Sequence, residues 1–339
     1  MQVRTIRICS PSRLHFGLLS FGHVGKPQFG GVGIMLNQPG LEVEFSLTAE
    51  SESKSVGLGE ILPSGPLAER IQMHATSWFL NRHGGTRISP GRITANVVRS
   101  PRLHNGLGTG TQVALAVATG MEILYCGEEW ETVQQRPGSL AKSVDRLGRS
   151  SIGTWGFVEG GLIWDGGRIS PDALGKLNKR TTVPEEWRAV LILSPGEGLS
   201  GEKEKSALAS LPPIPETTTE RLTELIEQQI FPAAESDDIG QFGEAVFEYG
   251  CLAGECFASS QGGCFASPRL ASWVKEIRDR GYHGVGQSSW GPALFTFVPD
   301  EPTAQEMCQW FAKDVDSSVD LIVAQPNQHG ALVQEISIS

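Results

Sequence analysis

The sequence predicts an α+β fold, and three observations lead to that class. Short alternating stretches typical of strands open the chain, helical stretches mixed with further strands follow, and no regular strand–helix–strand repeat is present. A glycine-rich loop also leads straight into a helix that is apolar almost all round. Such a helix must be covered on several sides, so it belongs in the middle of a layered domain.

Alternation and β-branched residues predict strands at 3–9, 41–48, 92–98, 162–165, 188–194, 293–298 and 319–324. Apolar spacing of three and four predicts helices at 67–82, 112–125, 219–231, 238–258, 268–280 and 303–313. The prolines of residues 206–218 predict a hinge or an inter-domain connection there.

The bulk composition excludes several classes of protein. With 339 residues and a net charge of −10, the chain has no cluster of lysines and arginines of the kind that binds nucleic acid. No run of about 18 apolar residues predicts a membrane span, and the N-terminus lacks the apolar core of a signal peptide. The six cysteines form no CxxC pair, which argues against a disulfide framework or a zinc site. We therefore expect a cytoplasmic protein with reduced thiols.

The strongest local signal is the segment from Pro101 to Gln112, which reads PRLHNGLGTGTQ and opens the buried helix. Its glycines allow the backbone to approach a ligand closely, and the start of the helix offers unpaired N–H groups to an anion. Thr109 and Thr111 add hydroxyls for phosphate oxygens or a metal ion. The alternative is a glycine-rich turn with threonine caps.

Three ordered motifs resemble those of the GHMP superfamily of small-molecule kinases. The glycine loop is similar to the family's phosphate-binding motif, residues 11–17 (PSRLHFG) to its first motif, and residues 284–292 (GVGQSSWGP) to its third. The Gly-Thr-Gln ending of the loop, with GGVG at 30–33 and GTWGF at 153–157, most resembles the β-ribofuranosylaminobenzene 5'-phosphate synthases.

The resemblance implies a GHMP-kinase-like fold of two domains. Residues 1–185 would form the N-terminal domain, like domain 2 of ribosomal protein S5 and carrying the phosphate loop, and residues 186–339 a ferredoxin-like C-terminal domain. It also implies a reaction of phosphoribosyl pyrophosphate with 4-hydroxybenzoate or 4-aminobenzoate that releases carbon dioxide and pyrophosphate, for tetrahydromethanopterin synthesis. Mg²⁺ and a homodimer are part of the same expectation.

The first motif supplies the two predicted catalytic residues, Arg13 and His15. Arginine suits bidentate binding of phosphate or carboxylate, and histidine moves a proton near neutral pH. The alternatives are a surface ion pair for Arg13 and a satisfied core position for His15. Phosphate binding is assigned to nine further positions: Ser12, His104, Asn105, Gly106, Gly108, Thr109, Gly110, Thr111 and Gln112, with Thr109 or Thr111 also a candidate for the metal.

A substrate pocket is predicted around Arg149, Thr154, Trp155, Lys203, Ser288 and Ser289. Trp155 could stack on the benzoate, although a tryptophan more often belongs to a core. Lys203 could belong to a phosphate-binding lid, although a solvated run of charges is the more common reason for such a segment. Ser288 and Ser289 would line the pocket floor or permit close packing.

Two other functions are considered beside the synthase. An ATP-dependent kinase would bind a nucleotide on the same loop, but Gly153 stands where many GHMP kinases carry an aspartate base. A non-catalytic binding module would keep the fold without turnover. Consumption of ATP separates the first from the synthase, and loss of affinity for phosphate ligands would favour the second.

Overall fold

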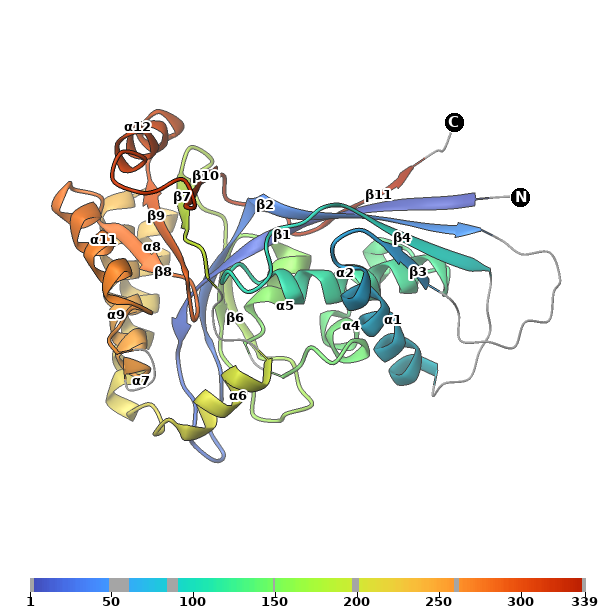
Figure 1. Ribbon diagram of the computed structural model, residues 1–339. Coiled ribbons are helices and arrows are strands. Elements are labelled where there is room, and N and C mark those ends of the chain that lie inside the picture. The colour runs from blue at the N-terminus through green and yellow to red at the C-terminus, as the bar shows by residue number, and fades with distance from the viewer. Residues whose placement is uncertain are drawn as a thin grey trace.

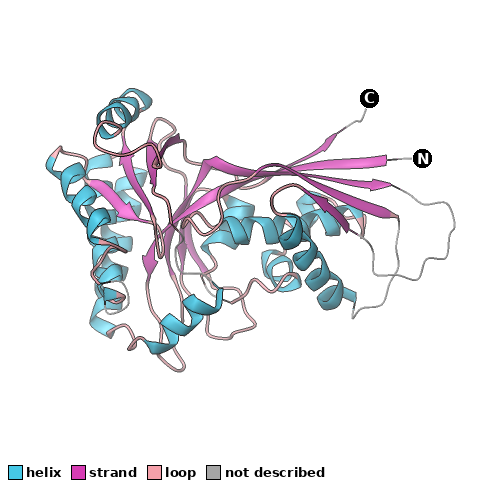
Figure 2. Ribbon diagram, viewed as in Figure 1, coloured by secondary structure: helices cyan, strands magenta, loops and turns pink. Residues whose placement is uncertain are grey.

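The computed structural model describes residues 3–48, 61–83, 91–148, 150–196, 201–258 and 262–336, and for 201–205 it describes the backbone alone. Within these residues the elements form two sheets, each covered by helices (Figures 1 and 2). No helix among them is long and apolar enough to cross a membrane.

The first sheet has seven strands and a central order β11-β1-β2-β4-β3, with β5 on β2 and β6 on β5. Helices α1, α2, α4 and α5 lie together below it in Figure 1, and α2 packs into the core beneath β1 and β2. The strands are β1 (Val3–Leu18), β2 (Gly31–Thr48), β3 (Ile61–Ser64), β4 (Arg92–Arg99), β5 (Leu162–Asp165), β6 (Leu177–Thr181) and β11 (Leu332–Ile336). The helices are α1 (Ala68–His83), α2 (Thr109–Leu124), α3 (Trp130–Val133), α4 (Pro137–Ser143) and α5 (Ile152–Glu159).

The second sheet has four antiparallel strands in the order β10-β7-β9-β8. They are β7 (Arg188–Leu193), β8 (Gly284–Gln287), β9 (Ala293–Val298) and β10 (Asp320–Ala324). Its helices are α6 (Gly201–Ser210), α7 (Glu216–Leu225), the π-helical turn η1 (Ile226–Ile230), α8 (Phe231–Glu235), α9 (Ile239–Glu255), α11 (Pro268–Asp279) and α12 (Glu301–Phe311).

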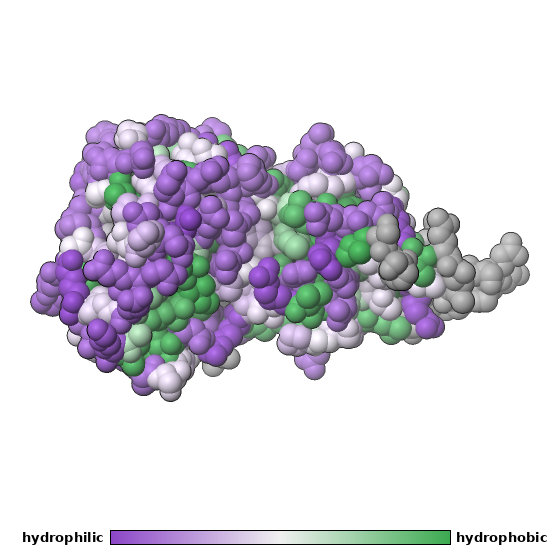
Figure 3. All heavy atoms as spheres, turned by 90° about the horizontal axis from the view of Figure 1, so that it is seen from above, coloured by the Kyte–Doolittle hydropathy of each residue, from purple (hydrophilic) through white to green (hydrophobic). Residues whose placement is uncertain are grey.

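The long strands β1 and β2 tie the two sheets together. Their far ends extend into the second half of the molecule, where Leu14 and Phe16 pack with residues of α9 and β9 in one core. Seen from above, the molecule consequently has two lobes joined by a narrower waist, with hydrophobic patches on a largely hydrophilic surface (Figure 3).

The predicted α+β class is confirmed, and most predicted elements are present, but β1 and β2 are longer than expected. Their 16 and 18 residues absorb much of the glycine-rich stretch, because glycines allow the close strand pairing there rather than ending it. The short strands β3, β6, β8 and β11 and the helices α3, α4, α5, α6 and α8 were not predicted. The strands have only four or five residues, which is too few for a periodicity to be recognised.

The proline-containing segment 206–218 is not the connection between the lobes, which corrects that prediction. Leu211 and Ile214 are buried against Phe21, and the Ile214 N–H donates to the carbonyl of Phe21 at 3.2 Å. The chain instead passes from the first sheet to the second between β6 and β7. The predicted division after residue 185 falls in that passage, although β11 returns to the first sheet, and it stays a prediction.

Candidate functional site

The three sequence motifs meet at one place, through hydrogen bonds between their backbones and one serine. The Arg13 N–H donates to the Leu107 carbonyl at 2.9 Å, and the Ser289 N–H donates to the His15 carbonyl at 3.0 Å. The buried Ser288 hydroxyl accepts from the His15 N–H at 3.1 Å and donates to the Gly106 carbonyl at 2.7 Å. The fold therefore brings β1, the glycine loop and the loop after β8 to one point.

A cleft of about 1340 Å³ opens at this meeting point. Arg13 and His15 reach it together because alternate residues of a strand share a face, while Leu14 between them turns into the core. Residues of α1, the glycine loop, α9 and the segment around Leu208 complete its walls. The volume suits a substrate larger than a single phosphate or a single ring.

Helix α2 starts at the cleft without a side-chain cap. Its N-cap residue, Gly108, has the left-handed conformation (φ 73°), and no N-cap side chain accepts a hydrogen bond from the N–H groups of the first turn. The adjoining residues up to Thr111 line the cleft. Unsatisfied N–H groups and the positive end of the helix dipole therefore face the cleft, as in known anion sites.

Three arginines surround this helix start. The backbone of Gly108 lies beside the Arg13 side chain, since a Cβ added to Gly108 would stand 3.0 Å from Arg13 Nε. Arg146 Nη2 donates to the Gly110 carbonyl at 2.7 Å. Arg70 comes from α1, and its Nη2 lies 3.0 Å from His104 Nε2. A fourth arginine, Arg168, lines the same cleft. Asp145 is the one acidic residue among the described lining residues, so the cleft is cationic in a chain of net charge −10.

His74 adds a buried polar atom at the same place. Its side chain is 4% exposed and lines the cleft, and its Nε2 has no hydrogen-bond partner among the described residues. Burial, followed by the positive charges of Arg146 and Arg70, lowers the pKa of His74 to about 3. An unpaired buried polar atom costs roughly 1–3 kcal/mol, which a bound anion accepting from this neutral imidazole would offset.

Aromatic residues form another part of the cleft wall. Phe257 contacts both Phe21 and Trp290, and its ring centroid lies 5.6 Å from that of Phe21 and 4.6 Å from that of Trp290. Phe29 joins the same cluster, and the Arg168 guanidinium lies 5.3 Å from its ring centroid. The cleft thus combines a cationic region with a region that suits a flat apolar group.

Of the predicted site residues, those that line the cleft are Arg13, His15, His104, Gly106, Gly108, Thr109, Gly110, Thr111 and Ser289. Arg149 lies outside the described residues, and so does the side chain of Lys203.

Six other predicted residues are buried or packed behind the cleft wall, which corrects their assignment as lining residues. They are Ser12, Asn105, Gln112, Thr154, Trp155 and Ser288. Each polar group that bonds does so to backbone: Ser12 Oγ to the Pro39 carbonyl, Gln112 Nε2 to the Gly153 carbonyl at 3.0 Å and Trp155 Nε1 to the Gly175 carbonyl at 2.8 Å. Trp155 also packs between two hydrophobic clusters, so its ring is a core side chain.

Sequence reasoning missed several residues of the site. Arg70 and His74 lie one turn apart on α1 and both reach the cleft, while Arg146 comes from the irregular segment between α4 and α5. None belongs to a motif. The one available signal was the pairing of Arg70 and His74 at i and i+4 on a helix.

The described residues contain no group of three or more His, Cys, Asp or Glu that could hold a metal ion. A magnesium ion held mainly by substrate phosphates and water needs only one or two protein oxygens. Asp145 and Thr111 line the cleft beside the start of α2, and they supply a carboxylate and a hydroxyl of that kind. The donor set therefore fits a phosphate-bound Mg²⁺.

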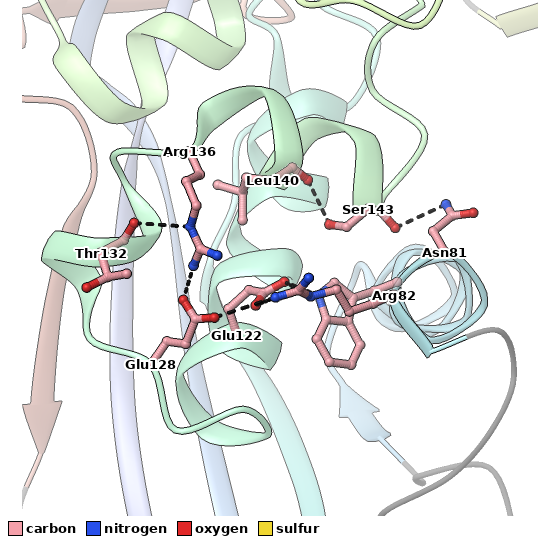
Figure 4. A network of polar contacts seen from close by, with 9 residues as sticks. Asn81, Arg82, Glu122, Glu128, Thr132, Arg136, Leu140 and Ser143 are labelled. Carbon is pink, nitrogen blue, oxygen red and sulfur yellow. Dashed lines mark hydrogen bonds and ion pairs between the residues drawn. The ribbon is translucent and has the colours of Figure 1, made fainter.

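A smaller cavity of about 540 Å³ lies on the other side of α4 and is a poor anion site. Its two central arginines are already paired: Arg82 Nε lies 3.2 Å from Glu122, and Arg136 pairs with Glu128 (Figure 4). Glu122 also accepts from Trp78 Nε1 at 3.0 Å. This network stabilises the contact between α1 and α2 and leaves little positive charge for a ligand.

Comparison with known proteins gives consistent results. Residues 230–313 match the family model described as GHMP kinases C terminal. A β-ribofuranosylphenol 5'-phosphate synthase of Methanothermobacter thermautotrophicus is 29% identical over 315 residues, covering 87% of this chain and 89% of the relative. The synthase of the same name from Methanocaldococcus jannaschii is 26% identical, covering 86% and 88%.

Solved structures agree on the fold. Homoserine kinase from Cytophaga hutchinsonii superposes with a TM-score of 0.66 at 16% identity, covering 97% of each chain. Mevalonate diphosphate decarboxylase from Enterococcus faecalis gives a TM-score of 0.66 at 10% identity, covering 99% of this chain and all of the other. At these identities the likeness concerns the fold alone, and it confirms the GHMP-kinase-like α+β fold expected from the motifs.

Proposed function

We infer that the chain belongs to the GHMP superfamily, and we propose that it is a β-ribofuranosylphenol 5'-phosphate synthase like its relatives. It would condense phosphoribosyl pyrophosphate with a para-substituted benzoate, releasing carbon dioxide and pyrophosphate. The observation that carries the proposal is one cleft with a cationic region at the start of α2 and an aromatic region beside it.

The cationic region suits the phosphate groups of the first substrate. The uncapped start of α2 with Arg13, Arg70 and Arg146 would hold these groups and stabilise the charge that develops as pyrophosphate leaves. A magnesium ion, when bound, would neutralise part of that charge. Asp145 and Thr111 are the residues that would hold it, together with substrate oxygens.

The aromatic region suits the ring of the second substrate. Phe21, Phe257 and Trp290 would hold the ring and exclude water while its carbon attacks the anomeric carbon. The relatives are named for a ribofuranosylphenol product, and 4-hydroxybenzoate is the benzoate that would supply a phenol ring. It is therefore the first candidate for this substrate. Magnesium dependence, a homodimer and a cytoplasmic location remain predictions.

The kinase alternative is less well supported. Gly153 lines the cleft, and a Cβ added to it would stand 3.1 Å from Thr111 Cγ2. A carboxylate at this position would face the phosphate loop, as expected for a kinase base, but glycine supplies none. A non-catalytic binding role gives no reason for a histidine in the cleft wall, two residues from Arg13.

The direct test is incubation of the purified protein with Mg²⁺, phosphoribosyl pyrophosphate and 4-hydroxybenzoate labelled in its carboxyl group. Release of labelled carbon dioxide that requires both substrates is the expected result, and 4-aminobenzoate then tests the ring preference. A folded protein that releases no label, yet hydrolyses ATP when small alcohols are supplied, would replace the synthase by a kinase.

A further inference from the structure

A line of polar groups leads from the cleft wall to a buried carboxylate behind it. His15 lines the cleft, and its Nε2 lies 3.1 Å from the Ser150 hydroxyl. The same hydroxyl donates to Asp165 Oδ2 at 3.4 Å. Asp165 stands at the end of β5, is 1% exposed and does not line the cleft. It can therefore influence a ligand only through the residues in front of it.

The Asp165 carboxylate is firmly held. It accepts from the Ser151 N–H at 2.6 Å and from the Gly167 N–H at 2.9 Å. Burial raises the pKa of Asp165 to about 6, and these two bonds together with the one from Ser150 act in the opposite direction. The carboxylate is thus charged at neutral pH but close to its protonation range.

Three other titratable or charged groups face this carboxylate. Arg168, from the turn after β5, favours its charged form. Tyr249, from α9, has its pKa raised by burial and, to a smaller degree, by Asp165. His15, from β1, is reached through Ser150. Arginine stays charged in proteins and burial keeps Tyr249 neutral, so His15 is the member of this set whose side chain suits proton transfer.

The bond from Ser150 to Asp165 lets us assign the tautomer of His15. With the Ser150 proton donated to the carboxylate, the Ser150 oxygen is left to accept from an Nε2–H of His15. The other ring nitrogen, Nδ1, then carries the lone pair that takes up a proton. A carboxylate behind the hydroxyl also stabilises the imidazolium that results, as second partners of histidines do elsewhere.

From this geometry we propose that Asp165, acting through Ser150, is a positioning residue that makes His15 the proton acceptor for the para hydroxyl of the aromatic substrate. This role rests on the function proposed above. His15 follows Arg13 on the same face of β1, about 7 Å further along the strand. The strand runs on to Leu18, which packs against the aromatic region. The para hydroxyl lies on the side of the ring opposite the reacting carbon, so it would point away from the phosphates.

The step balances without any further reactant. The phenolic O–H bond breaks, its proton goes to His15, and the oxygen electron pair moves into the ring. The ring carbon that bears the carboxylate bonds to the anomeric carbon as the bond from that carbon to pyrophosphate breaks. Carbon dioxide then leaves, its bonding pair restores the aromatic ring, and His15 returns the proton to the phenolate oxygen.

The test measures the His15 imidazole directly by nitrogen-15 NMR in the full-length protein, with the variant His15→Asn assigning the signal. In Asp165→Asn and in Ser150→Ala, the pH midpoint of the His15 titration should fall by about one pH unit, because the stabilising charge is removed or disconnected. The value of kcat should fall about 10- to 100-fold, with its acid limb moved to lower pH. Ser150→Ala keeps both backbone bonds to Asp165, so it serves if Asp165→Asn does not fold.

Asp172→Asn is the matched control, because it removes an exposed carboxylate that also interacts with Arg168 but lies outside the cleft. A His15 titration that is the same in all four proteins would overturn the positioning role, whether or not the enzyme is active. A second outcome is that the wild-type protein has no synthase activity, while the His15 midpoint still falls in Asp165→Asn and Ser150→Ala. That result would overturn the proposed reaction and the role of His15 as its proton acceptor.

Discussion

At the residue scale, Arg70 contributes a positive charge to the cleft from outside any motif. Its guanidinium is half-buried and contacts His104, so a phosphate in the cleft would meet a charge that is partly shielded from water. We expect Arg70→Gln to raise the KM for phosphoribosyl pyrophosphate about 10- to 100-fold, the loss of one charge-assisted hydrogen bond. The KM for the benzoate should change much less. Steady-state kinetics with each substrate varied in turn measures both.

The matched control is Arg269→Gln on α11, where the side chain is half exposed and pairs with Asp316. An exposed pair contributes little, so this variant should keep both KM values. If Arg70→Gln and Arg269→Gln behave alike, the phosphate site is not at the start of α2.

His74 gives a prediction for the dependence of stability on pH. Its pKa is lowered from 6.5 to about 3 in the folded protein, so the unfolded chain binds a proton across that range and the folded protein does not. Stability is therefore complete above pH 6.5 and is lost as the pH falls towards 3. Between pH 7 and pH 5 the wild type should lose about 2 kcal/mol more of its unfolding free energy than His74→Gln.

Denaturant unfolding at the two pH values measures this difference, and His329→Gln, which alters an exposed histidine, is the control. The control should follow the wild type. An equal loss in wild type and His74→Gln would mean that His74 becomes protonated in the folded protein and does not have the buried, neutral state described here.

At the element scale, α2 combines two tasks. Fourteen of its 16 residues are buried, and its first turn nevertheless faces the cleft. Gly120 allows the close approach to the sheet, because a Cβ there would stand 2.9 Å from the Phe45 ring. We expect Gly120→Ala to destabilise the protein by about 1–2 kcal/mol, since overpacking exceeds the helix propensity that alanine gains.

Gly250→Ala is the control that separates the gain in helix propensity from the cost of overpacking. Gly250 also lies inside a long helix, α9, but its nearest neighbour would be the Phe16 carbonyl at an ordinary 3.7 Å. This variant should be neutral or more stable by up to about 1 kcal/mol. The urea midpoints of the two variants, compared with that of the wild type, measure both changes in stability. A stabilised Gly120→Ala would show that α2 is free to move away from β2.

The elements also show how far sequence reasoning reached. The loop from Gly106 to Thr111 was recognised because its function depends on local order: glycines first, then a helix start. Arg70 and Asp165 were not, since each becomes part of the site only when distant elements pack together. The prediction that Trp155 lines the substrate pocket was wrong for the opposite reason. Its motif was recognised, but the packing of α5 turns the ring into the core.

At the scale of the whole molecule, the site depends on contacts between the two lobes. Ser288, from the second sheet, bonds both to β1 and to the glycine loop, so neither lobe forms the cleft alone. The position of β11 has the same consequence, because the end of the chain pairs with β1 in the first sheet. Local periodicity cannot predict such long-range pairing, which is why the predicted division into two consecutive segments describes the chain only in part.

A ligand that spans this junction should stabilise the whole fold. Inorganic pyrophosphate with Mg²⁺ is the simplest probe, because it offers the cationic region two phosphate groups without the ribose or the ring. At a concentration 100 times its Kd it should add about 2.7 kcal/mol to the unfolding free energy and raise Tm by about 4–5 °C. The same additions to Arg70→Gln should give a much smaller rise, because its affinity is lower.

Arg269→Gln should respond like the wild type, and the rise should shrink as salt is added, since exposed charges are screened. Equal increases in wild type and Arg70→Gln would place pyrophosphate elsewhere on the protein. If pyrophosphate binds at the start of α2, the rise in Tm of the wild type measures how strongly the two lobes are coupled. A ligand bound to one lobe then stabilises both lobes against unfolding, because Ser288 connects the glycine loop to the second sheet.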